Sequence, residues 1–244
     1  MGTVTRAWIP NQHGAWAMLI TPVLVGALLA GPTPWHLLLL AAWLAAYCAS
    51  FFTGLAVKSR RPGRYQRQLL AYAAATVILG LPLAIQAPSL LWLVPAAIVA
   101  FAVNVAFILR RNERAWVNDA VGILLASCVG AGAVLVGGTP RLDAHALLAL
   151  TVVGLYFLGT VVYVKTLIRE RGSAAWRRAS LLLHAAYGVA ALVAHWWLAA
   201  LIALALLARA ALVPGRGWTP KRVGLTEIAW TLLVSFVALL GLPA

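Results

Sequence analysis

The sequence predicts an all-α protein, a polytopic bundle of membrane-spanning helices that forms a single transmembrane domain over residues 1–244. Three observations predict it. Hydrophobic residues make up 64% of the chain and charged residues only 10%, with a mean hydropathy of +0.94. Long apolar runs follow one another along the whole sequence, and the basic residues gather in alternate connecting segments. Such a chain lacks the polar groups that the surface of a water-soluble domain needs.

Each expected helix is an apolar run of about 17 to 25 residues, the length that crosses a bilayer. We expect nine, at residues 14–31, 36–57, 69–86, 89–109, 117–137, 144–164, 179–195, 197–213 and 225–242. The turn-forming stretches GPTP, AP, GGTP and PG follow the first, third, fifth and eighth runs, and basic segments follow most of the others. The seventh and eighth helices must form a tight hairpin. No cleavable signal sequence is apparent, so the first run is expected to remain as a helix.

The orientation follows from the basic residues, which accumulate on the cytoplasmic side of membrane proteins. With the N-terminus inside and the C-terminus outside, only Arg141 among the 19 lysines and arginines falls in an outer segment. The acidic residues are distributed in the same way, because only Asp143 faces outward. We therefore predict nine helices with N-in, C-out topology in the inner (cytoplasmic) membrane, and we expect the chemistry on the inner face.

Candidate binding residues lie at the inner end of the sixth helix. Lys165 and Arg169 are four residues apart and share a helix face, and Glu170 follows them. They could contact an anionic ligand, with Glu170 pairing with a neighbour. Alternatively, they form a solvated helix end whose long side chains reach the membrane surface.

A second group surrounds the segment between the fourth and fifth helices. Asn104 lies more than one turn inside the membrane, where an amide needs a partner, and it shares a face with Arg111. Asn118 and Asp119 open the next helix, where the helix dipole favours a carboxylate. These two residues either belong to the site or simply cap the helix.

The first inner loop and the entrance of the first helix complete the candidate site. Lys58 and Arg61 could bind an anion, or they could set the topology and contact anionic headgroups. Asn11 and His13 precede the first apolar run. His13 could exchange a proton near neutral pH, with Asn11 beside it. The alternative is that both residues cap the helix while nearby tryptophans anchor it in the interface.

The sequence predicts no metal site and no cofactor. Cys48 and Cys128 lie in apolar runs without a partner motif. His184 and His195 are eleven residues apart, about 16 Å along a helix, so they cannot share one metal. A haem would need two histidines at one depth on different helices, for example His13 with His184.

The stretches PNQHGAWAMLITPVLVG, NDAVGILLAS and VVYVKTLIRERG resemble the YwiC-like family of bacterial integral membrane proteins over nearly the full length. A more distant similarity is to the UbiA superfamily of intramembrane prenyltransferases, which also have nine helices and cytoplasmic active-site loops. In that superfamily, Asp-rich motifs after the second and sixth helices hold Mg²⁺ and a prenyl diphosphate. The corresponding stretches here read ASFFTGLAVKSRRP and YVKTLIRERGS, without aspartates, so the resemblance implies a basic site and no metal ligands.

These observations predict a UbiA-like bundle that binds an isoprenoid phosphate or a similar anionic amphiphile in a basic cavity on the cytoplasmic side. Arginine and lysine would then replace part of the charge neutralisation by Mg²⁺, and a Mg-independent transferase would be the catalytic form. The expected partners are membrane lipid or isoprenoid phosphate and anionic headgroups, not nucleic acid. A membrane transporter is the alternative, and a haem-binding electron carrier is a further one.

Overall fold

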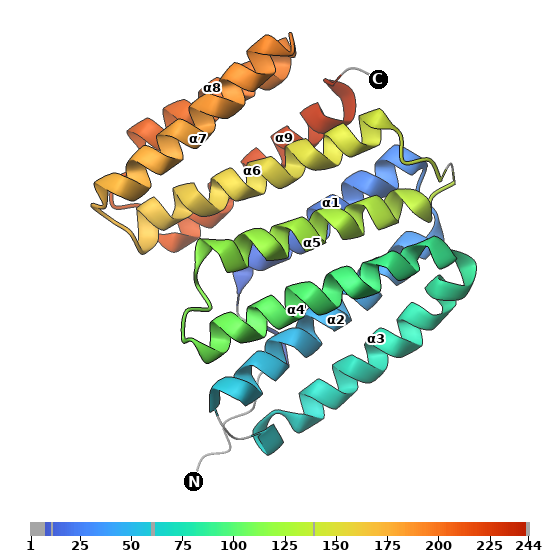
Figure 1. The fold of residues 1–244 in the computed structure, drawn as a ribbon. Helices are drawn as coiled ribbons and strands as arrows, with labels where there is room; N and C mark the ends of the chain where they lie inside the picture. Colours follow the sequence, from blue (N-terminus) through green and yellow to red (C-terminus); the bar gives the residue numbers. More distant parts are fainter. Residues whose placement is uncertain (1–7, 11, 60–61, 139, 243–244) are drawn as a thin grey trace.

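A computed structural model describes residues 8–10, 12–59, 62–138 and 140–242, and within these ranges it contains helices and no strands (Figure 1). The all-α prediction is therefore confirmed. The α-helices are α1 (His13–Ala30), α2 (Pro34–Ser59), α3 (Gln66–Gln86), α4 (Leu93–Leu109), α5 (Trp116–Leu135), α6 (Ala144–Ile168), α7 (Ala174–Val193), α8 (Trp197–Leu212) and α9 (Pro220–Leu240). Short 3-10 helices, η1 (Pro62–Arg64) and η2 (Pro88–Trp92), precede α3 and α4.

Each predicted apolar run coincides with one α-helix, but several helices extend beyond the run. Helix α7 begins five residues earlier than predicted, where the hydroxyl of Ser173 accepts a hydrogen bond from the Trp176 amide. Helix α9 likewise begins at Pro220, after a capping hydroxyl on Thr219. An apolar run marks only the part of a helix suited to hydrocarbon, whereas the helix itself continues to a polar cap or to a proline at its first position.

Helices α1 and α5 pack against each other near the middle of the bundle, with α3 at one edge and the α7–α8 hairpin at the other (Figure 1). Their backbones approach so closely that a Cβ atom on Gly26 would lie 2.2 Å from the carbonyl oxygen of Gly130. The largest buried apolar cluster is formed by residues from α1, α5, α6, α8 and α9, so this contact joins the two sides of the fold.

The loops that follow α2, α4, α6 and α8 lie at one end of the bundle (Figure 1). We call this end the basic end, because almost all lysines and arginines belong to it or to the adjoining helix turns. The segment before α1 is also held there, since Tyr47 donates a hydrogen bond to the Gln12 side chain over 3.1 Å and Tyr72 donates one to the Trp8 carbonyl over 2.9 Å. The N-in, C-out orientation stays a prediction.

Six of the described helices are long and apolar enough to cross a membrane: α2, α3, η2 with α4, α5, α6 and α9. Helices α1 and α8 are apolar but shorter, and whether they and α7 also cross stays a prediction. The surface agrees with a lipid environment, because large apolar side chains such as Leu37, Ile85 and Val193 are 73–74% exposed. A water-soluble monomer rarely leaves so much contiguous apolar surface uncovered.

Candidate functional site

The basic end of α6 is held to the start of α5 by Lys165. This lysine is 8% exposed, and its ammonium lies 2.9 Å from the Asp119 carboxylate and donates to the Arg114 carbonyl over 2.6 Å. The indole of Trp176, on α7, lies 5.5 Å from the ammonium. Arg169 is exposed but is close enough to Asp119 to interact with its charge. The predicted shared face of Lys165 and Arg169 therefore points toward α5.

A second chain of contacts joins α4 and α2 to the same loop. The Asn104 amide donates to Asn118 over 3.3 Å, and Asn118 donates to the Glu113 carbonyl over 2.8 Å. The Glu113 carboxylate forms a salt bridge with Lys58. This hydrogen bond from Lys58 is the main reason that the pKa of Glu113 lies below its ordinary value. The intramembrane amide of Asn104 thus has the partner that its burial requires.

The structure brings together Lys58, Asn104, Asn118, Asp119 and Lys165 around the α4–α5 loop. Their charges mostly satisfy one another, which makes this assembly a brace between helices rather than an open anion site. Their predicted role in substrate binding stays a prediction.

The remaining predicted residues either lie away from the α4–α5 loop or fall outside the residues that the structure describes. Arg111 is exposed and lies two residues after the end of α4, in the left-handed backbone region with φ of 55°. Asn11 and Arg61 lie outside the described residues, and the same holds for the side chain of His13, the first residue of α1. Glu170 lines a pocket at the basic end.

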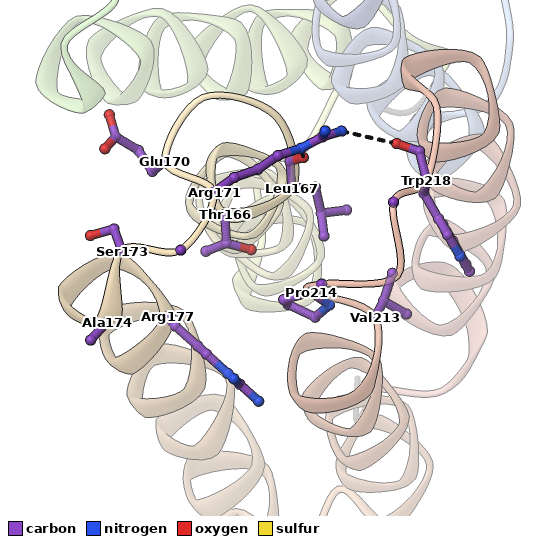
Figure 2. A pocket seen from close by; sticks show the side chains of 13 residues that line it. Thr166, Leu167, Glu170, Arg171, Ser173, Ala174, Arg177, Val213, Pro214 and Trp218 are labelled. Carbon is purple, nitrogen blue, oxygen red and sulfur yellow. Dashed lines mark hydrogen bonds between the residues drawn. The ribbon is translucent and has the colours of Figure 1, made fainter.

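That pocket, of about 360 Å³, lies between the α6–α7 and α8–α9 loops. Its polar lining includes Glu170, Arg171 and Arg177, and its apolar lining includes Val213 and Trp218. Figure 2 shows Arg171 stretched across the mouth toward the Trp218 carbonyl, Arg177 reaching toward α8, and the Glu170 carboxylate turned away from the Arg171 guanidinium. The pocket therefore presents two cations beside apolar side chains.

Both arginines are positioned by carbonyl groups at helix ends. Arg171 donates to the Leu167 carbonyl in the last turn of α6 and to the Trp218 carbonyl over 3.2 Å. Arg177 donates to the Ala211 carbonyl in the last turn of α8 over 3.3 Å. The Leu167 and Ala211 carbonyls lie in last helical turns, where carbonyls lack a partner within the helix. Each arginine satisfies one of them and keeps further N–H groups for a ligand.

Sequence reasoning missed a buried ion pair deeper in the bundle. Arg209 of α8 is only 7% exposed and forms a salt bridge with Glu227 of α9. Glu227 also accepts hydrogen bonds from Tyr156 over 3.3 Å and from Thr160 over 3.2 Å. The available signal was the position of both charged residues within apolar runs, where an ionisable side chain indicates a functional site.

Two buried histidines, His36 and His184, form hydrogen bonds within the bundle. Both ring nitrogens of His36 are occupied by hydrogen bonds, with the Thr33 amide at 2.9 Å and with the Ala133 carbonyl at 2.9 Å. His184 is buried, and its Nδ1 donates to the Ser180 carbonyl over 2.7 Å. Both side chains therefore have structural roles within the bundle.

Long apolar helices, an apolar outer surface and charged loops gathered at one end define a multi-pass membrane protein. Comparison with known proteins then gives its family. The family model described as YwiC-like protein matches residues 9–135. The chain is 36% identical over 230 residues to the uncharacterized protein YwiC of Bacillus subtilis (strain 168). The aligned region covers 91% of this chain and 93% of that protein.

A second relative, an uncharacterized protein of Haemophilus influenzae, is 32% identical over 233 residues, covering 95% of this chain and 97% of that protein. The chain belongs to the YwiC-like family, which confirms the resemblance predicted from its motifs. No solved structure matches it. The comparisons do not extend to the UbiA superfamily, and that similarity stays a prediction.

Proposed function

We propose that this protein binds an anionic amphiphile, such as an isoprenoid phosphate, in the pocket between the α6–α7 and α8–α9 loops. The observation that carries the proposal is the joint placement of Arg171 and Arg177 beside Val213 and Trp218. Guanidinium groups bind phosphate through charge-assisted and often bidentate hydrogen bonds. The apolar side chains suit the start of a hydrocarbon chain, and the volume suits a head group at the lower end of the range for ligand pockets.

The location of the pocket supports the same class of ligand. It lies at the ends of α6 and α8, where Trp218 is placed as interfacial tryptophans are in membrane proteins. The Arg222 guanidinium lies 4.4 Å from the Trp218 ring centroid, which adds positive charge near the mouth. A lipid could therefore bind with its head group in the pocket and its chain along the helices. We place this end on the cytoplasmic side of the inner membrane.

The test compares two adjacent arginines on α7. Both side chains are exposed, but Arg177 lines the pocket and Arg178 is not part of the lining. In neutral-lipid nanodiscs, Arg177→Gln should weaken binding of farnesyl phosphate about tenfold, the low end for a lost charged hydrogen bond. Arg178→Gln should change it less than about twofold, as expected for a solvent-screened charge outside the pocket. Equal losses in both variants would show that general surface charge attracts the ligand and would refute the pocket.

Metal dependence provides a second check on the proposal. Because arginines supply the positive charge, EDTA should leave the affinity for farnesyl phosphate unchanged, whereas added salt should weaken it. A requirement for millimolar Mg²⁺ would contradict the arginine-based site. Native mass spectrometry of the purified protein would identify the lipid that remains bound.

Transport is a second candidate function, and the buried Arg209–Glu227 pair favours it. Ionisable residues within membrane helices often line the pathways of transported substrates. In liposomes, the protein should then speed the passage of a fluorescent polyprenyl phosphate from the outer to the inner leaflet. If correctly folded protein does not speed the passage of this lipid between the leaflets, transport of this lipid is excluded. Binding at the pocket would then stand as the proposed function.

A further inference from the structure

The buried Arg209–Glu227 pair uses only part of the arginine. Nη1 of Arg209 contacts Oε1 of Glu227, whose other oxygen already accepts from Tyr156 and Thr160. The Tyr156 hydroxyl also lies 3.2 Å from the backbone carbonyl of Glu227 and 3.2 Å from the Thr231 hydroxyl. The carboxylate therefore contacts one guanidinium nitrogen and two hydroxyls. The arginine, in turn, contacts Glu227 through Nη1.

Two aromatic rings lie near the guanidinium. Its Cζ atom lies 4.0 Å from the Tyr163 ring centroid and 5.6 Å from the Trp230 ring centroid. Cation–π contacts of this kind orient the planar group and leave its edges for hydrogen bonds. Helices α6 and α9 therefore each place one aromatic ring beside the Arg209 guanidinium.

One edge of this oriented group has no partner. Among the described residues, no hydrogen-bond acceptor contacts Nε or Nη2 of Arg209, although both atoms are buried. These two atoms form the edge of a guanidinium that presents two parallel N–H groups, the fork that matches a carboxylate or phosphate. Leaving two donors of a buried cation unsatisfied is unfavourable, so this edge is suited to an acceptor from outside the described chain.

Two further donors without partners lie on the neighbouring helix α7. The hydroxyls of Ser180 and Tyr187 are buried and have no hydrogen-bond partner among the described residues. Tyr187 and His184 pack on Gly159 of α6, one turn from Tyr163. His184 is close enough to Arg209 to interact with its charge. Helix α7 therefore packs Tyr187 and His184 against the turn of α6 that precedes Tyr163.

We propose that the Nε–Nη2 edge of Arg209 is an oxyanion-binding site inside the bundle, taking a carboxylate or phosphate group. The group could come from a lipid head group or from a small anion in water, since both offer the same paired oxygens. The site binds the anion beside Glu227 rather than in place of it, because Glu227 occupies Nη1 on a different side of the guanidinium.

This site is distinct from the loop pocket and does not depend on it. Arg209 lies one helical turn before Val213, and Tyr163 lies one turn before Leu167, on the side away from the loops. Val213 and Leu167 line the loop pocket and also belong to a buried apolar cluster that includes Tyr163. An apolar layer therefore lies between the two sites.

The test measures anion affinity of the full chain in phosphatidylcholine nanodiscs by calorimetry, with chloride keeping the ionic strength constant. Inorganic phosphate and acetate probe the aqueous source, and nanodiscs containing phosphatidic acid, analysed by native mass spectrometry, probe the lipid source. Arg209→Lys keeps the positive charge but loses the fork, and it should weaken binding at least tenfold. Glu227→Gln keeps the fork and removes the competing negative charge, so it should strengthen binding severalfold.

Two controls separate this proposal from the loop pocket. Arg177→Gln should leave the affinity of the Arg209 site unchanged, so loss of all anion binding in this variant would place the anion in the loop pocket and overturn the inference. The inference also fails if neither phosphate, acetate nor phosphatidic acid binds the wild-type protein. If Arg209→Lys does not fold, the result for Glu227→Gln decides, because unchanged or weaker binding in that variant contradicts an anion at Arg209.

Discussion

Replacing Lys165 with Met tests whether this lysine braces the fold or binds a ligand. The substitution keeps the length and apolar stem of the side chain but removes the ammonium. Asp119 then loses its cation at 2.9 Å, and the Arg114 carbonyl loses its donor at 2.6 Å. Because the lysine is almost fully buried, we expect the main effect on the free energy of unfolding.

The magnitude follows from how exposed each partner is. Removing one member of a fully buried ion pair costs about 3–5 kcal/mol. The Asp119 side chain, however, is 35% exposed, so water can solvate part of its charge and lower the cost. A hydrogen bond to a charged group contributes about 1.5–3 kcal/mol. We therefore expect Lys165→Met to lower the free energy of unfolding by about 2–3 kcal/mol.

Unfolding by SDS in mixed micelles, followed by circular dichroism, measures this change. In the double variant with Asp119→Asn, no unpaired carboxylate remains, and about 1–2 kcal/mol of coupling energy should appear in the double-mutant cycle. The matched control Arg169→Met removes an exposed cation one turn away and should change stability by less than about 0.5 kcal/mol. If Lys165→Met leaves stability intact but weakens farnesyl phosphate binding tenfold, the brace interpretation is wrong and the lysine is a ligand contact.

Three further predictions follow from packing, charge and topology. Gly26→Ala should lower the melting temperature markedly, because its Cβ would lie 2.2 Å from a carbonyl oxygen of α5. The control Gly122→Ala should not lower it, because a Cβ there would meet no atom of a neighbouring element within 4 Å. The pKa of Glu113 is lowered by its lysine partner, so this contact stabilises the fold above the ordinary pKa near 4.5 and is lost as the pH falls through the lowered value. Melting curves between about pH 6 and pH 3 should therefore flatten in Glu113→Gln, and an unchanged pH profile would contradict the contact. In a cysteine-free background, Ser173→Cys should react with an impermeant thiol reagent only from inside and Ser89→Cys only from outside; the reverse pattern would invert the topology.

The fold was largely predictable because hydrocarbon thickness fixes the length of each apolar run. Each predicted run coincides with a helix, and the alternation of basic loops predicted which helix ends meet. The errors lie at the polar ends. The start of α7 at Ala174 and the extension of α6 to Ile168 depend on capping and interfacial residues, which a search for apolar runs does not weigh.

The candidate site was predictable in position but not in its internal pairing. The topology predicted from the basic segments put Lys165 and Asp119 at the same end of the bundle, yet the sequence could not show that they form an ion pair. Their separation of 46 residues along the chain is bridged only by the packing of α5 on α6. The loop pocket was missed for a similar reason, because its lining comes from two loops that meet only after α6 to α9 have packed.

Pairing, rather than the number of charges, decides which basic residues can bind an anion. Lys58, Lys165 and Arg209 each form a salt bridge, and for the two lysines the ammonium is committed to protein acceptors. Arg209 differs because a guanidinium carries five N–H groups in a fixed plane, so one carboxylate can hold one corner while the opposite edge keeps its donors. A lysine at this position would give its whole charge to Glu227. The choice of arginine is therefore what makes a buried ion pair able to accept a second anion.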